Sequence, residues 1–302
     1  MRPRRRAVPD GALSAEAREP RTATLLIMCP DRPGLVAAIS GFIYRHGGNI
    51  LAADQHSDVE SGRFYMRVVW DLGGFALDRA GTAAALDALG RDYAMEWDLR
   101  YSETQQRVAV LVSKTPHCLY DLLQARQLGE LGGDIVGVIS NHDDLRSVAS
   151  HFDVPYVSVP MRAAARDRSE SEMQAVLTEW RADLVVLARY MQVLSDKFVD
   201  RWQGRLINIH HSFLPAFVGA RAYRQARERG VKMIGATAHY VTNELDKGPI
   251  IEQDVVRVSH QDTLSDFIRK GRELERIVLT RAVRLHLERR VVVSETGTVV
   301  FS

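Results

Sequence analysis

Residues 107–140 read RVAVLVSKTPHCLYDLLQARQLGELGGDIVGVIS. Two short apolar runs flank a helical pattern, which predicts a strand over 107–113, a helix over 118–128 and a strand over 135–140. The same alternation continues, with helices expected at 145–151 and 172–180 and buried strands at 184–188 and 206–209. Repeated units of this kind indicate an α/β fold with a doubly wound, mostly parallel sheet. The last third predicts longer strands at 233–241 and 250–258 and a long helix at 263–287.

The region upstream has a different order of elements. Strands are expected at 24–28, 50–57, 64–70 and 94–101, with one helix beginning at Leu35 and another over 82–93. This βαββαβ order predicts a ferredoxin-like domain over 22–102, joined by a polar hinge at 103–106 to a second domain over 107–302. Residues 1–21 are rich in Arg, Pro, Ala and Glu and have no apolar segment, so we predict a disordered tail there.

Composition narrows the class of protein. The chain has 302 residues, a net charge of +2 and two cysteines. This small charge predicts no nucleic-acid partner, and the two cysteines exclude a disulfide framework and fit a reducing cytosol. No apolar run approaches the roughly 20 residues that a membrane-spanning helix needs. We therefore expect a cytoplasmic protein that contacts neither membrane nor nucleic acid.

The segment LINIHHSFLP, residues 206–215, carries the first candidate site residues. Asn208 and His210 are two positions apart on a predicted strand, so their side chains share one face. They lie at its carboxyl end, where open α/β sheets build their sites. An amide can donate to a developing oxyanion and an imidazole can relay a proton, so the pair suits acyl chemistry.

A second segment, TNELDKGPI at residues 242–250, predicts a turn-rich loop between two strands. Its Asp246 could orient a histidine and activate a water molecule. We predict that Asn208, His210 and Asp246 converge to form the catalytic set.

Other polar residues have simpler interpretations. We favour turn-forming roles for His211 and Ser212, because no ligand spacing completes a metal site and no Gly-x-Ser-x-Gly motif surrounds the serine. Cys118 follows His117, but a packing role at a helix start is favoured over a thiol–imidazole pair. His239 could either support the site or simply pack. A solvated helix face is predicted from four charged residues: Glu273, Glu275, Arg276 and Arg281.

Several motifs together resemble the folate-dependent formyltransferase family: Asn208-Ile209-His210, Leu214-Pro215, Gly219, residues 235–239 (GATAH) and residues 245–250 (LDKGPI). The resemblance covers roughly residues 107–287. It implies Asn208 as oxyanion donor, His210 facing the formyl oxygen and Asp246 as general base or proton relay. It also implies support from Thr237 and His239. The implied folate-binding residues are Tyr190, Met191, Gln192, Val193, Leu194, Val241, Thr242, Asn243 and Glu244.

The subclass is indicated by a difference from the nucleotide-binding transferases, which carry a glycine-rich phosphate loop after their first strand. Here that position reads SKTPHCL, residues 113–119, without glycine and with a proline that lacks an N–H. The segment is similar to that of the formyltetrahydrofolate deformylase family. This similarity implies a hydrolase acting on a linear amide, 10-formyltetrahydrofolate, in one-carbon metabolism and purine biosynthesis. It implies no cofactor and no metal.

The N-terminal segments DRPGLV, residues 31–36, and GGNI, residues 47–50, resemble an ACT domain. That resemblance implies an amino-acid effector, such as methionine or glycine, near Asp31, Gly34 and Asn49. Asp31 and Asn49 could instead simply cap or terminate the first helix. The resemblance also implies a homodimer or homotetramer. Two rival functions stay open: formyl transfer to an amine acceptor, and a catalytically silent amino-acid sensor.

Overall fold

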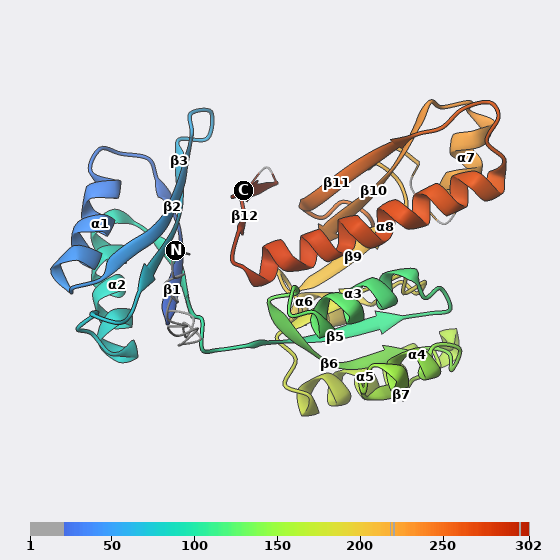
Figure 1. The fold of residues 1–302 in the computed structure, drawn as a ribbon, viewed down its shortest axis with the longest axis horizontal. Helices are drawn as coiled ribbons and strands as arrows, with labels where there is room; N and C mark the ends of the chain where they lie inside the picture. The colour runs from blue at the N-terminus through green and yellow to red at the C-terminus, as the bar shows by residue number, and fades with distance from the viewer. Residues whose placement is uncertain (1–20, 218, 220, 296, 302) are drawn as a thin grey trace, which may run out of the picture.

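The computed structural model describes residues 21–217, 219, 221–295 and 297–301 (Figure 1). The predicted tail therefore lies outside the described residues, apart from Arg21. The first unit comprises β1 (Thr22–Pro30), α1 (Leu35–Arg45), β2 (Asn49–Asp58), β3 (Arg63–Asp71), α2 (Arg79–Tyr93) and β4 (Glu96–Tyr101). Its antiparallel sheet has the order β2-β3-β1-β4. The predicted βαββαβ order is confirmed, although β1 extends into the expected turn as far as Pro30.

The two faces of this first sheet have different partners. Along β1, Leu25 and Ile27 point to the core formed with α1 and α2. Leu26 and Met28 point to the opposite face, as the period of two in a strand requires. That second face is turned toward the rest of the molecule (Figure 1).

The second unit contains a larger sheet with the order β11-β10-β9-β8-β5-β6-β7. Neighbouring strands from β9 to β7 are parallel, whereas β10 pairs antiparallel with both β9 and β11, so the predicted mostly parallel sheet is confirmed. The elements in chain order are β5 (Gln106–Val112), α3 (His117–Gln127), β6 (Gly133–Ser140), α4 (Arg146–His151), β7 (Tyr156–Ser158), α5 (Arg166–Glu179), β8 (Leu184–Leu187), α6 (Asp196–Arg201), β9 (Leu206–His210), α7 (Ala222–Glu228), β10 (Met233–Tyr240), β11 (Ile250–Arg257) and α8 (Leu264–Leu287).

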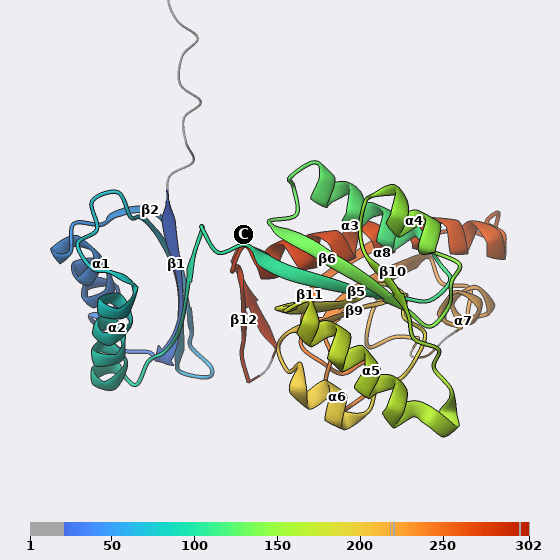
Figure 2. The ribbon, with the colours of Figure 1, turned by 90° about the horizontal axis from the view of Figure 1, so that it is seen from below.

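Helices cover both faces of this sheet (Figure 2). On β5, Val108 and Val110 pack with residues of α3, α4 and α8, while Ala109 and Leu111 pack with residues of α5 and α6. Both faces of the central strand are thus buried, which explains its continuous apolar sequence.

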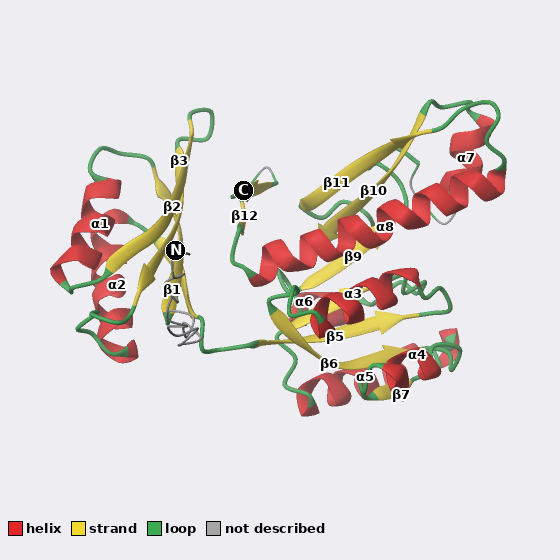
Figure 3. Cartoon of the chain, viewed as in Figure 1, coloured by secondary structure: helices red, strands yellow, loops and turns green. Residues whose placement is uncertain are grey.

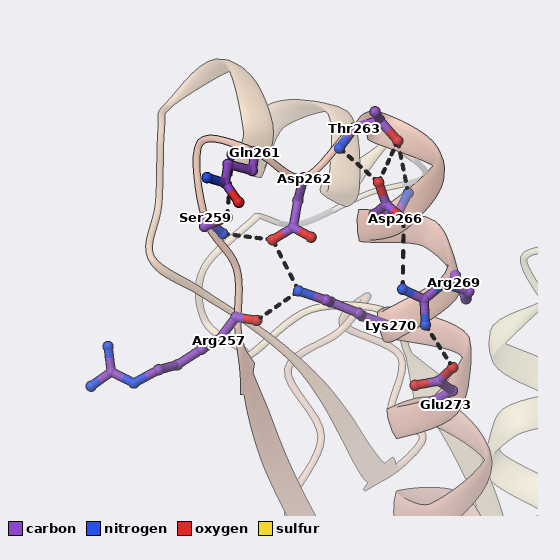
Figure 4. A network of polar contacts seen from close by, with 9 residues as sticks. All are labelled: Arg257, Ser259, Gln261, Asp262, Thr263, Asp266, Arg269, Lys270 and Glu273. Carbon is purple, nitrogen blue, oxygen red and sulfur yellow. Dashed lines mark hydrogen bonds and ion pairs between the residues drawn. The ribbon is translucent and has the colours of Figure 1, made fainter.

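The long helix α8 is fixed at its N-terminus by polar contacts (Figure 4). Thr263 and Asp266 form a capping box, which satisfies backbone N–H groups that have no partner within the helix. Lys270 Nζ lies 2.9 Å from Asp262 Oδ2 and 3.2 Å from the carbonyl oxygen of Arg257, which ties the helix to the end of β11. These contacts set the register of α8 against the sheet.

The predicted solvated face of α8 is wrong for Glu275, whose side chain is only 1% exposed. Glu275 lies four residues after the buried Gly271 and four before the buried Leu279. This spacing places it on the apolar stripe of the helix. Glu273 and Arg276, by contrast, are exposed as predicted.

Short elements were missed by the sequence pattern. These are β7, α6, α7 and a C-terminal hairpin of β12 (Val291–Val293) and β13 (Thr298–Val300). The hairpin lies between the two units (Figure 3). Phe301, just after it, packs with Leu26 and Tyr65 of the first sheet. Three-residue strands are too short to show a periodic pattern.

Among the described residues, no helix combines the length and the apolar character that crossing a membrane would require.

Candidate active site

Asn208 and His239 lie opposite each other on the neighbouring strands β9 and β10. The Nδ1 atom of His239 is 2.8 Å from the backbone carbonyl oxygen of Tyr240. Because a carbonyl only accepts, the hydrogen of the neutral ring is on Nδ1, and Nε2 must accept. That atom is 3.3 Å from Asn208 Nδ2, which donates to it. Burial lowers the pKa of His239, which keeps this ring neutral. The amide of Asn208 is therefore held with its NH₂ group toward His239.

Asp246 reaches the same place from the loop between β10 and β11. Its Oδ1 atom lies 3.3 Å from His210 Nδ1 and 3.9 Å from His239 Nε2. Burial alone would raise the pKa of Asp246, but the hydrogen bond and charge of His210 outweigh it and lower that pKa. The structure thus brings together the amide, the imidazole and an ionised carboxylate that the sequence singled out.

The backbone of this loop requires a glycine two residues later. A Cβ atom on Gly248 would lie 1.7 Å from the carbonyl oxygen of Tyr240, a distance that no side chain can tolerate. Asp246 itself adopts a left-handed conformation with φ of 58°. The close approach of the loop to β10 is what delivers the carboxylate to His210.

Thr237 supports the turn that follows His210. Its hydroxyl donates to the carbonyl oxygen of Ser212 at 2.8 Å and accepts from Leu214 N at 3.0 Å and from Gln253 Nε2 at 2.9 Å. Ser212 Oγ donates to the carbonyl oxygen of Ala216 at 2.6 Å, which agrees with the turn-forming role predicted for this serine. His211 does more than form a turn, because it also lines the cavity beside the site.

That cavity has a volume of about 350 Å³. It is lined by Asn208, His210 and Asp246 and also by every residue expected to bind folate: Tyr190, Met191, Gln192, Val193, Leu194, Val241, Thr242, Asn243 and Glu244. Further lining residues include Arg189, Val199 and Leu245. Sequence reasoning could have added Leu245 to the predicted cavity residues, because Leu245 adjoins Asp246. It could not have added Val199, because Val199 lies in α6, which has no clear sequence signal.

One group of possible metal ligands occurs among the residues described. It consists of His117, Cys118 and Glu275, whose ligand atoms lie within 4.8 Å of one another. Glu275 Oε2, however, is 2.9 Å from His117 Nε2 and 3.3 Å from Arg189 Nε, and the guanidinium would repel a cation. Burial, with the negative charge of Glu275, raises the pKa of Cys118 well above its usual value. Cys118 packs in the core, as predicted, and the donor set fits a metal poorly.

Asp31, Gly34 and Asn49, which were expected to bind an effector, do not lie close together within a single chain. Asp31 and Gly34 follow β1, whose last residue Pro30 pairs with Arg63, whereas Asn49 pairs with Asp71 at the opposite end of β3. Nor does Asp31 cap α1, because Gly34 is the N-cap residue and no side chain caps it.

The family comparisons agree with this architecture. Residues 106–283 match the family described as formyl transferase, and residues 23–91 match the ACT domain. The class of protein is therefore a formyl transferase fold preceded by an ACT domain.

Close relatives identify the family more narrowly. The chain is 51% identical to the formyltetrahydrofolate deformylase of Synechocystis sp., over 93% of this chain and 99% of the relative. It is 44% identical to that of Escherichia coli K12, over 91% and 97% of the two chains. The crystal structure of the Pseudomonas syringae deformylase superposes with a TM-score of 0.92 at 46% identity, covering 95% of this chain and 96% of that one. This chain belongs to the formyltetrahydrofolate deformylase family.

A more distant structure covers a smaller share of this chain. The glycinamide ribonucleotide transformylase 1 of Symbiobacterium toebii superposes with a TM-score of 0.63 at 32% identity, covering 68% of this chain and 98% of that chain. The fold alone therefore does not distinguish proteins named as deformylases from those named as transformylases.

Proposed function

We propose that this protein hydrolyses 10-formyltetrahydrofolate to formate and tetrahydrofolate. The observation that carries the proposal is the meeting of Asn208, His210 and Asp246 in a single cavity. Its other walls come from residues 189–194 and 241–245, which offer apolar side chains and backbone groups to a flat heterocycle. The names of the relatives support the same reaction.

In the proposed mechanism, the formyl group lies against Asn208 and His210. Asp246 accepts a proton from water as the water oxygen attacks the formyl carbon. The lowered pKa of Asp246 keeps the carboxylate ready to act as this base. Asn208 Nδ2 and protonated His210 then donate to the tetrahedral oxyanion. When this intermediate collapses, the bond from carbon to N10 breaks, N10 takes up a proton, and formate leaves.

The two rival functions have less support. A catalytically silent sensor would not need the buried contact between Asp246 and His210, or the amide orientation imposed by His239. An amine-dependent transferase would need an acceptor site beside the formyl carbon. The segment after β5, residues 113–119, contains no glycine and therefore forms no glycine-rich phosphate loop before α3 begins at His117.

Formate release tests the proposal directly. Purified protein and 10-formyltetrahydrofolate, with no amine present, should yield formate and tetrahydrofolate in equal amounts. Asn208→Ala should lower kcat by about 10²–10³ because one oxyanion donor is lost. Gln105→Ala, which removes an exposed amide in the hinge, is the matched control. Formylated product formed only when an amine is supplied would favour the transferase instead.

We further propose a cytoplasmic location, since Cys29 and Cys118 are both unpaired thiols. There the reaction would supply formate and tetrahydrofolate to purine biosynthesis. We propose that neither a metal nor another cofactor takes part, so chelators should not lower activity.

An amino acid such as methionine or glycine is proposed as effector at the ACT domain, in a homodimer or homotetramer. Asp31 and Gly34 would contact it together with Asn49 of a second copy, since one chain does not bring these residues together.

A further inference from the structure

A buried carboxylate outside the catalytic set holds three polar side chains from separate elements. Tyr223 of α7 donates a hydrogen bond to Glu275 Oε1, and His117 at the start of α3 approaches Oε2 to 2.9 Å. Arg189, after β8, brings Nε to an ion-pair distance of 3.3 Å from the same oxygen. We call these four residues the Glu275 cluster. Burial alone would raise the pKa of Glu275, but the hydrogen bond of His117 and the charge of Arg189 outweigh it and lower that pKa.

The Glu275 cluster forms a wall between two hollows. On one side, Arg189 lines the catalytic cavity. On the other, His117 lines a surface hollow together with Arg272 and Arg276 of α8. Because Arg189 and His117 contact the same carboxylate oxygen, little more than the carboxylate separates the two spaces.

The wall adjoins the reacting end of the cavity. The ring centroid of His211 lies 5.1 Å from that of His210 and 5.5 Å from that of Tyr223. Two aromatic contacts therefore connect the proposed catalytic imidazole to the Glu275 cluster. The folate-binding segments 190–194 and 241–245 supply other parts of the cavity lining.

Two features show that the backbone is shaped around this cluster. A Cβ atom on Gly271 would lie 2.1 Å from Tyr223 Oη, so only glycine lets the tyrosine reach Glu275 one turn further along α8. Arg189 has φ of 63°, a left-handed conformation that is unfavourable for a residue other than glycine. The structure maintains this conformation with the guanidinium beside Glu275.

We infer that the Glu275 cluster selects water as the nucleophile by closing the route through which a larger amine would reach the formyl carbon. The inference rests on the proposed hydrolysis. Water needs only the small space beside Asp246, whereas an amine with substituents needs an open path from the surface. In the competing transfer, the amine nitrogen would bond to the formyl carbon, the bond to N10 would break, and the amine proton would pass to N10. The hollow that contains Arg272 and Arg276 lies on the opposite side of the Glu275 cluster from the catalytic cavity. The cluster therefore blocks the path from this hollow to the formyl carbon.

A partition experiment measures this selection. Enzyme and 10-formyltetrahydrofolate are mixed with glycinamide, and formylated glycinamide and formate are both quantified. Wild type should give almost only formate. Arg189→Gly combined with His117→Ala should raise the ratio of formylated glycinamide to formate at least about tenfold. The ratio does not depend on the total rate, so a general loss of activity cannot imitate the effect. Hydroxylamine, which is hardly larger than water, should show a much smaller change between wild type and variant.

Arg272→Ala is the matched control, because it removes an exposed arginine of the same hollow outside the cluster. Its ratio should equal that of wild type. If the double variant is unfolded, Arg189→Gly alone carries the test, since glycine favours the backbone conformation at that position. A folded, folate-binding variant whose ratio stays at the wild-type value would overturn the inference. Failure of wild type to release formate would instead contradict the proposed function.

Discussion

At the scale of single residues, the orientation of the Asn208 amide depends on His239. The register between β9 and β10 places His239 opposite Asn208, and the carbonyl oxygen of Tyr240 fixes the tautomer of the His239 ring. This pairing joins segments that are distant in the chain, so the role of His239 has no local sequence signal. The strand alternation, by contrast, predicts that Asn208 and His210 share a face, and the family motifs point to Asp246.

The depressed pKa of Asp246 makes stability depend on pH in a definite direction. Because the folded-state pKa lies below the unfolded value of about 3.9, the carboxylate stabilises the fold above that value. This contribution is lost as the pH falls through the folded-state pKa. The advantage of wild type over Asp246→Asn in free energy of unfolding should therefore shrink between about pH 5 and about pH 3. Urea unfolding at both pH values measures it. An advantage that grows on acidification would show that the carboxylate is not stabilised in its charged form.

At the scale of elements, long periodic segments were predicted well and short ones were not. The β5–α3–β6 unit and α8 follow clear apolar patterns, whereas α6, α7 and the C-terminal hairpin are too short to establish one. The error at Glu275 has a different origin. A charged residue on an apolar stripe appears solvated until its buried partners, contributed by three other segments, are known.

Two helical glycines give a matched test of the packing between α7 and α8. Gly271→Ala would place a methyl group 2.1 Å from Tyr223 Oη, and overpacking of this kind typically costs about 1–3 kcal/mol. Gly41→Ala in α1 would meet only the flexible end of Arg45, at 3.3 Å. The better helix propensity of alanine should therefore stabilise Gly41→Ala by up to about 1 kcal/mol. Chemical unfolding of both variants compares them. Equal stabilisation by both changes would contradict the close packing of Gly271.

At the scale of the whole molecule, the sequence predicted two domains but not how they contact each other. The C-terminal residues join them. Arg67 of β3 donates to the carbonyl oxygens of Arg289 at 2.9 Å and Glu288 at 3.2 Å, and Arg289 lies 3.0 Å from Asp98. The neighbouring His286 accepts at Nδ1 from Tyr240 Oη, 2.8 Å away. Since burial lowers the pKa of His286 to about 3, it remains a neutral acceptor, and the contact leads from the domain boundary to β10.

Phe301 tests the contribution of this boundary to stability. It is 5% exposed and packs on Leu26 and Tyr65. Removing a buried phenylalanine side chain costs about 3–5 kcal/mol, so Phe301→Ala should weaken the association of the two domains by an energy near the lower end of that range. Val300→Ala, at a position that is 39% exposed, should cost much less. Denaturant unfolding followed separately in each domain provides the measurement. Unchanged unfolding of the first domain in Phe301→Ala would show that the contact contributes little.

The most direct test of the central claim uses water labelled with ¹⁸O. If Asp246 activates water against the formyl carbon, each formate molecule released should contain one oxygen atom from the solvent. Asp246→Asn should bind the folate yet release almost no labelled formate. Unlabelled formate from wild type, or labelled formate from Asp246→Asn at nearly the wild-type rate, would contradict the assignment of Asp246 as the base that activates water.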